Sequence, residues 1–310
     1  MPGLFLFVRM TREVCLLTCA DMSSPFLLLP HRSVLALRGP DTIALLERLV
    51  TNATTDWSIG ETRYGALLTP QGKVIADYLA TRTDDGVLLD VAKETADELA
   101  KRLKMFRLRS QVEIDLLTNM HVFVALDDAS IGAEPIAGAD LVFCDPRYAN
   151  GRLRAFTERE DWGAAKHSIH DYHVDRMDNV VPEQGTDFGS AEVFPADINM
   201  DVLGGIALNK GCFVGQEVVS RMHRRGKIRK RTLKIETSDQ NPVQPGEEIK
   251  APLPIGVVTS AEQWRALAII RTDRLQRAET TGDAPTLNET PVTITKPGWL
   301  LAELAPMEET

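Results

Sequence analysis

The side chain best suited to chemistry in this sequence is the thiol of Cys212. It stands between Gly211 and Gly215, two residues after Lys210 and just ahead of apolar residues with helical spacing. Glycines let a ligand approach the main chain, and the start of a helix favours negative charge, including a thiolate. We therefore predict that Cys212 is a functional thiol and that Lys210 supports its ionisation. The alternative is a small buried hydrophobe, since free cysteine is among the most buried residue types.

The run 210–217 reads K-G-C-F-V-G-Q-E and resembles the signature K-G-C-[YF]-x-G-Q-E of the YgfZ family. That family contains folate-binding proteins that are related to the glycine-cleavage T protein, an aminomethyltransferase, and that are linked to iron–sulfur cluster assembly and repair. Further blocks resemble the family in the family's order, over about 230 residues in all. These blocks are Thr51-Asn52, 68–73, 107–110, Asp145-Pro146-Arg147, Pro182-Glu183 and 199–201.

The resemblance implies an α+β fold with a T-protein-like folate-binding core and a small C-terminal β-barrel. We expect an extension over 1–21, a core of two subdomains over 22–231, and the barrel over 232–310. Short apolar runs between Gly and Pro turns after residue 232 are typical of such a barrel. The polar stretch 276–290 is predicted to be a loop.

The cofactor that the resemblance implies is tetrahydrofolate or a derivative. Asp77 falls in a predicted strand over 73–81, where a carboxylate among apolar neighbours needs a partner, and a pterin presents a donor edge that suits it. Asn52 either ends the predicted helix after Asp41 in the left-handed conformation or contacts the ligand. Asn199 and Asp201 are spaced so that a strand would aim them the same way. The predicted folate contacts are Asn52, Asp77, Glu183, Asn199, Asp201, Gln216, Glu217 and Arg221.

The same strand bears on whether the protein is an enzyme. In T proteins it carries an Asp-Asp pair that includes the acid needed for aminomethyl transfer, whereas this sequence reads Ala76-Asp77. The resemblance therefore predicts folate-dependent support of iron–sulfur cluster assembly or repair, with assembly or client proteins as partners. A folate-dependent aminomethyltransferase or one-carbon transferase is the first alternative, and half of its acid pair is missing.

Charge is distributed unevenly along the chain. The net charge is −9, yet the segment 221–231 holds seven Lys or Arg residues and no acid. Such a segment is either a solvated face or a site for a polyanion, such as the glutamyl tail of folate or RNA. It contains no aromatic residue on which bases would stack. A protein- or RNA-binding module that acts through 221–231 is thus the second alternative, with nucleic acid disfavoured.

The cysteines point to a reducing compartment. Cys15, Cys19, Cys144 and Cys212 are too few and too scattered for a disulfide framework, and we expect Cys144 in the core. The location implied is a bacterial cytoplasm, or the mitochondrial matrix if 1–21 is a transit peptide. No apolar run is long enough to span a membrane.

No lasting metal site is expected, because no group of residues has metal-ligand spacing. The three histidines of a predicted helix over 162–177, at positions 167, 170 and 173, read as a solvated face. Transient ligation of iron by Cys212 is compatible with a single accessible thiolate.

Overall fold

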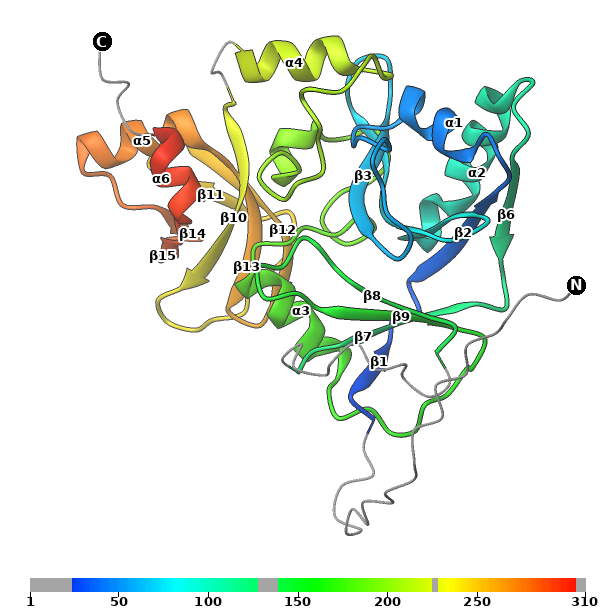
Figure 1. Cartoon of the computed structure of the whole chain (residues 1–310). Coiled ribbons are helices and arrows are strands. Elements are labelled where there is room, and N and C mark those ends of the chain that lie inside the picture. Colours follow the sequence, from blue (N-terminus) through cyan, green and yellow to red (C-terminus); the bar gives the residue numbers. More distant parts are fainter. Residues whose placement is uncertain (1–23, 128–138, 225–227, 305–310) are drawn as a thin grey trace, which may run out of the picture.

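The computed structural model describes residues 24–127, 139–224 and 228–304 (Figure 1). The predicted extension 1–21, with Cys15 and Cys19, lies outside the described residues. In the part that is described, none of the helices is both long and apolar enough to cross a membrane.

A five-stranded antiparallel sheet in the order β3-β4-β5-β2-β6 forms the first layer. Its strands are β2 (Arg32–Arg38), β3 (Thr62–Leu68), β4 (Val74–Arg82), β5 (Gly86–Ala92) and β6 (Glu113–Leu117). Two amphipathic helices, α1 (Thr42–Leu49) and α2 (Lys93–Arg107), bury their leucines against one face of the sheet. The predicted hairpin around Pro70-Gln71-Gly72 is confirmed as the β3–β4 pair.

A four-stranded antiparallel sheet in the order β1-β7-β9-β8 lies on the other side of the first sheet. Its strands are β1 (Phe26–Leu28), β7 (His121–Ala125), β8 (Leu141–Cys144) and β9 (Leu153–Thr157). One buried core joins the two sheets, since Tyr64, Val74 and Leu79 of the first pack in the same cluster as Val124 and Phe156 of the second. Cys144, expected in this core, is exposed at the end of β8, because its position in the strand alternates with that of buried Phe143.

The helix α3 (Ile169–Asp178) is shorter than the predicted 162–177. It begins at Ile169 because Ser168 and Asp171 form a capping box that fixes its start. Its histidines are not a free solvated face: His170 Nδ1 lies 2.6 Å from Glu262 of the barrel, and His173 Nδ1 accepts from Arg176 Nε at 2.9 Å. The helix therefore links the second sheet to the barrel.

The C-terminal part is a closed barrel in the order β10-β13-β12-β11-β14-β15, with β15 pairing back onto β10. Its elements are β10 (Lys230–Thr237), β11 (Glu248–Lys250), β12 (Pro254–Glu262), β13 (Arg265–Arg271), α5 (Thr272–Thr281), β14 (Thr286–Leu287), β15 (Thr290–Ile294) and α6 (Gly298–Leu304). The loop predicted over 276–290 is wrong, because α5 buries Leu275 and Ala278 one turn apart in the barrel core. The limit proposed after residue 231 falls inside β10.

Candidate functional site

Cys212 is exposed in the loop that precedes α4 (Gln216–Arg224). Gly215 ends this loop with φ +80°, and a Cβ there would lie 2.6 Å from the carbonyl oxygen of Thr69 in the β3–β4 turn. Only glycine fits such a contact. Gly72 of the same turn packs against Val218 of α4: a Cβ atom added at Gly72 would lie 2.9 Å from Val218 Cβ. Two blocks that are far apart in the sequence thus fix the thiol loop against the first sheet.

Lys210 anchors the other end of the loop. Its Nζ donates to the carbonyl oxygens of Val50 at 2.9 Å and Asn52 at 2.7 Å, and it lies 3.5 Å from Glu47. The side chain is only 2% exposed, and burial lowers the pKa of the ammonium, with Glu47 acting in the opposite direction. The charge of Lys210 is therefore committed to the carbonyls that end α1, where the helix dipole favours it. We expected it to act on the thiol; the structure gives it an anchoring contact.

Asn52 belongs to the same anchor. Its Nδ2 donates to the carbonyl oxygens of Tyr64 at 2.7 Å and Gly204 at 3.0 Å, and its Oδ1 accepts from Ala53 N at 2.8 Å. Both atoms of the amide have protein partners. The expected left-handed helix cap is wrong, since α1 ends at Val50 in an extended conformation. Asn52 instead ties the end of α1 to the segment that leads into the thiol loop.

Asp77 lies at the centre of the molecule, between the two sheets. It is 2% exposed, its Oδ2 accepts from Tyr64 Oη at 2.9 Å, and its amide donates to Gln184 Oε1 at 3.1 Å. Oδ1 is buried and has no hydrogen-bond partner among the described residues. Burial raises the pKa of Asp77, while Arg32 and Arg147 act in the opposite direction. Asp77 is thus buried and partnered, as a carboxylate on an apolar strand requires, but its surroundings also include Tyr64, Gln184 and two arginines.

Glu183 is buried in the same region. It accepts from Tyr172 Oη at 2.8 Å, contacts His31 Nε2 at 3.2 Å and lies 3.6 Å from Arg32. Burial opposes ionisation, but the His31 hydrogen bond and the charge of Arg32 outweigh it and hold the pKa of Glu183 well below its usual range. Glu183 is therefore an ionised acceptor inside the protein.

Sequence reasoning missed the buried charge network around these acids. Asp90 accepts from Arg32 Nε and Arg154 Nη1, both at 2.6 Å, and Asp145 accepts from Arg147 Nη2 at 2.7 Å and Arg154 Nε at 3.1 Å. Arg147, which the sequence placed only in a family-like block, stands 5.2 Å over the Tyr64 ring. A signal was present, because Asp90 and Arg154 interrupt otherwise apolar strands.

The other predicted folate contacts do not join Asp77. Asn199 and Asp201 follow the 3-10 helix η1 (Pro195–Ile198) rather than a strand, so they do not point the same way. Asn199 Nδ2 donates to Thr232 O at 2.8 Å, and Asp201 pairs with Arg231 at 2.6 Å. The remaining contacts, Gln216, Glu217 and Arg221, lie on α4.

The fit of a folate pterin can be judged from the buried acceptors. Asp77 Oδ1 is an acceptor without a described partner, and Glu183 is a second, ionised acceptor that shares Arg32 as a neighbour. These are the groups that a ring with a donor edge requires. Because both side chains are at most 2% exposed, entry requires side chains between the sheets to move.

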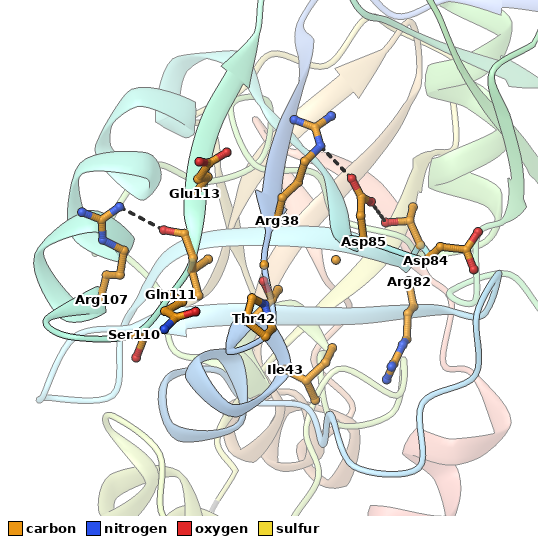
Figure 2. Close-up of a pocket in the computed structure, with 15 residues that line it drawn as sticks. Arg38, Thr42, Ile43, Arg82, Asp84, Asp85, Arg107, Ser110, Gln111 and Glu113 are labelled. Atoms are coloured by element: carbon orange, nitrogen blue, oxygen red, sulfur yellow. Dashed lines mark hydrogen bonds and ion pairs between the residues drawn. The ribbon is translucent and has the colours of Figure 1, made fainter.

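A separate hollow lies at the opposite end of α1. It has a volume of about 770 Å³ and is lined by Arg38, Thr42, Arg82, Asp85 and Arg107, among others. Figure 2 shows that the three guanidinium groups point in different directions, and that of Arg38 is paired with Asp85 at 3.1 Å. None of the predicted site residues lines it.

Within the described ranges, no group of three or more His, Cys, Asp or Glu side chains is arranged to hold a metal ion. This finding concerns a lasting metal site.

Two parts of the chain match known domain families. The family described as the GCVT N-terminal domain matches residues 30–127, and the CAF17 C-terminal beta-barrel domain matches residues 229–301. An iron–sulfur cluster assembly factor IBA57 homolog, mitochondrial, from Mycosarcoma maydis is 34% identical to the chain over 226 residues. The match covers 66% of this chain and 55% of the fungal protein. The chain is therefore similar to IBA57 proteins over about two thirds of its length and carries the two domain types just described.

Human IBA57, an iron–sulfur cluster assembly factor described as mitochondrial, is 28% identical to the chain over 247 residues, which are 71% of this chain and 69% of the human protein. The chain spans little more than half the length of these fungal relatives. The crystal structure of glycine cleavage system aminomethyltransferase T from Bartonella henselae matches with a TM-score of 0.67 at 13% identity, over 87% of this chain and 84% of that one. The predicted fold is confirmed: an aminomethyltransferase-like α/β core with a closed six-stranded β-barrel.

Proposed function

We propose that this chain supports iron–sulfur cluster assembly, as its relatives' names state for them, or cluster repair, and that it acts in a YgfZ-like way through Cys212. The observation that carries the proposal is an exposed thiol on the loop before α4, which two distant segments hold in place: the end of α1 and the β3–β4 turn. A fixed, accessible thiol suits transient ligation of iron, because the thiolate is the metal ligand and access controls its reactivity.

We further propose that tetrahydrofolate or a derivative binds between the two sheets. Asp77 and Glu183 would hold the donor edge of the pterin, since both are buried acceptors and Asp77 Oδ1 has no described partner. Bound tetrahydrofolate would supply a carrier of one-carbon units. Tyr64 orients Asp77 through its hydroxyl, and the buried arginines offset the negative charge that accumulates there.

The transferase alternative lacks support at the position that it needs. Ala76 lies on the opposite face of β4 from Asp77 and is fully buried in the apolar core beneath α1 and α2. Where T proteins carry the other acid of the pair, this chain therefore has an alanine side chain that packs in the core. The names of the relatives favour a mitochondrial location and partners in the iron–sulfur assembly machinery.

Complementation tests the proposed function. The chain, fused to a mitochondrial leader, is expressed in a Mycosarcoma maydis strain that lacks its IBA57 homologue, and the activity of mitochondrial iron–sulfur enzymes is measured. We expect rescue by the parent chain and by Cys144→Ser, and no rescue by Cys212→Ser. Cys144 is a matched control because it is the other exposed thiol of the described residues. Equal rescue by both variants would remove Cys212 from the function.

Calorimetric titration with tetrahydrofolate tests the ligand. We expect micromolar binding by the parent chain and by Asp115→Ala, an exposed acid on β6 of the same sheet, and about a tenfold loss or more for Asp77→Ala. Binding that Asp77→Ala leaves unchanged would place folate elsewhere. Absence of binding to the parent chain would remove folate from the account.

A further inference from the structure

A basic groove lies between α4, the β3–β4 turn and the start of the barrel. It has a volume of about 310 Å³. In Figure 1, α4 extends across the top of the molecule from the β3–β4 turn to the beginning of β10. The cations that line the groove are Lys73, Arg229, Lys230 and Arg271. Four cations around one small hollow are unusual in a chain whose net charge is −9.

Three of these cations, Lys73, Arg229 and Lys230, have no ion-pair partner among the described residues. Arg229 and Lys230 are exposed, whereas the next residue, Arg231, is buried and bound to Asp201 and Glu303. The chain thus satisfies one arginine of the segment internally and leaves its two neighbours facing the groove. The acids in the lining, Glu192 and Asp197, have backbone partners of their own.

The strand register adds an electrostatic cost. Lys230 is directly opposite Arg271 in the antiparallel β10–β13 pair. Like charges in this position destabilise a sheet, and only Arg271 has a carboxylate partner, Asp273 at 2.6 Å. A carboxylate from outside that enters beside Lys230 would relieve this repulsion.

The floor of the groove is apolar. Phe194 and Met222 line it, and Lys73 Nζ stands 5.9 Å from the Phe194 ring while donating to Glu192 O at 3.2 Å. Methionine adapts its shape to different apolar partners. A ligand that fits therefore carries carboxylates together with one apolar side chain. The volume is at the lower end for ligand cavities, which favours a short linear segment over a folded surface.

We propose that this groove binds a short acidic polypeptide segment, with one apolar anchor, of the iron–sulfur protein that meets Cys212. The proposal rests on the proposed function, because it gives that partner a docking site. The groove and the thiol share one support: Cys212 precedes α4, Met222 of α4 lines the groove, and Lys73 follows Gly72, which packs on Val218. A segment held in the groove would bring its protein to the helix that follows the thiol.

Fluorescence anisotropy with a labelled Glu-Glu-Leu-Glu-Glu peptide tests the proposal. We expect the full chain to bind this peptide, and binding to weaken as salt is raised, because screening reduces the attraction. Lys230→Glu and Arg229→Glu should each weaken binding about tenfold. Lys104→Glu, a charge reversal at an exposed lysine on α2, should leave it unchanged. Circular dichroism checks that each variant is folded.

Three outcomes would overturn the proposal: no peptide binding by the parent chain, the same loss for Lys104→Glu as for Lys230→Glu, or tighter Lys230-dependent binding of a uridine oligonucleotide than of the peptide. Cys212→Ser separates the groove from the proposed function, since it should bind the peptide as the parent chain does. If the peptide fails to bind while Cys212→Ser still loses complementation, only the docking proposal fails.

Discussion

At the scale of single residues, the molecule separates an accessible thiol from a buried acid. Cys212 is exposed on a loop whose ends are fixed. Asp77 is enclosed between two sheets, and one of its oxygens has no hydrogen-bond partner in the part of the chain that the structure describes. The first arrangement suits contact with a partner, while the second suits a small ligand that must enter the protein. The proposed function uses both.

Asp77 gives a prediction on stability. Because burial raises its folded-state pKa, the group stabilises the fold at low pH, and that contribution is lost as pH rises through the folded pKa. Asp77→Asn should therefore raise the free energy of unfolding by about 1 kcal/mol at pH 8, with the gain shrinking towards zero near pH 4. Urea unfolding at both pH values measures it. Asp115→Asn, at an exposed site, is the control; a gain that is independent of pH would contradict the argument.

Part of the site was readable from the sequence at this scale. An acid in an apolar strand identified Asp77, and a thiol among glycines identified Cys212. The roles of Lys210 and Asn52 could not be predicted from the sequence, because their partners are distant in the chain. Lys210 binds Val50, 160 residues away, and Asn52 binds Gly204, 152 residues away. The Asp90–Arg154 pair was missed for the same reason.

At the scale of elements, the turn after α2 is strained. Ser110 N donates to Arg107 O at 2.8 Å, and Leu108 between them has φ +49° and ψ −109°. These angles belong to the first central position of a type II′ turn, which glycine normally occupies. The Leu108 side chain is 86% exposed, so packing does not compensate for the strain.

Leu108→Gly should therefore stabilise the protein. Strain at such a position costs roughly 1–3 kcal/mol, more than the added entropy of a glycine in the unfolded chain, so we expect a net gain of about 1 kcal/mol in urea unfolding. Leu253→Gly is the matched control, because Leu253 is an exposed leucine without a positive φ; it should lose stability. If Leu108→Gly loses as much, the turn is not strained.

Local patterns predicted the elements whose sequence agrees with their contacts. The β3–β4 hairpin and the start of α4 after Gly215 were predicted because turn residues and periodicity coincide. The helix α5 was missed because most of its residues are polar. Its two buried residues, Leu275 and Ala278, pack only against the barrel, which the local sequence does not show.

At the scale of the whole molecule, three of the family-like blocks are neighbours in space: Thr51-Asn52, 68–73 and 210–217. Thr51 Oγ1 donates to Gly205 O at 2.6 Å, Asn52 meets Gly204, and the β3–β4 turn meets α4. Segments from the first sheet, the segment after η1 and α4 thus form one frame around the thiol loop. The two-sheet core could be predicted only from the resemblance, since periodicity specifies strands but not which sheets they join, whereas the short apolar runs after residue 232 also indicated the barrel.

In the proposed function, the Cys212 thiol is the group that contacts iron–sulfur proteins. The most direct measurement is the rate at which a purified apo iron–sulfur enzyme regains activity when the full chain, iron and sulfide are supplied. We predict that the parent chain and Cys144→Ser accelerate recovery equally and that Cys212→Ser is about tenfold slower, as expected when a ligand position is lost. Equal rates for Cys212→Ser and the parent chain would contradict the claim.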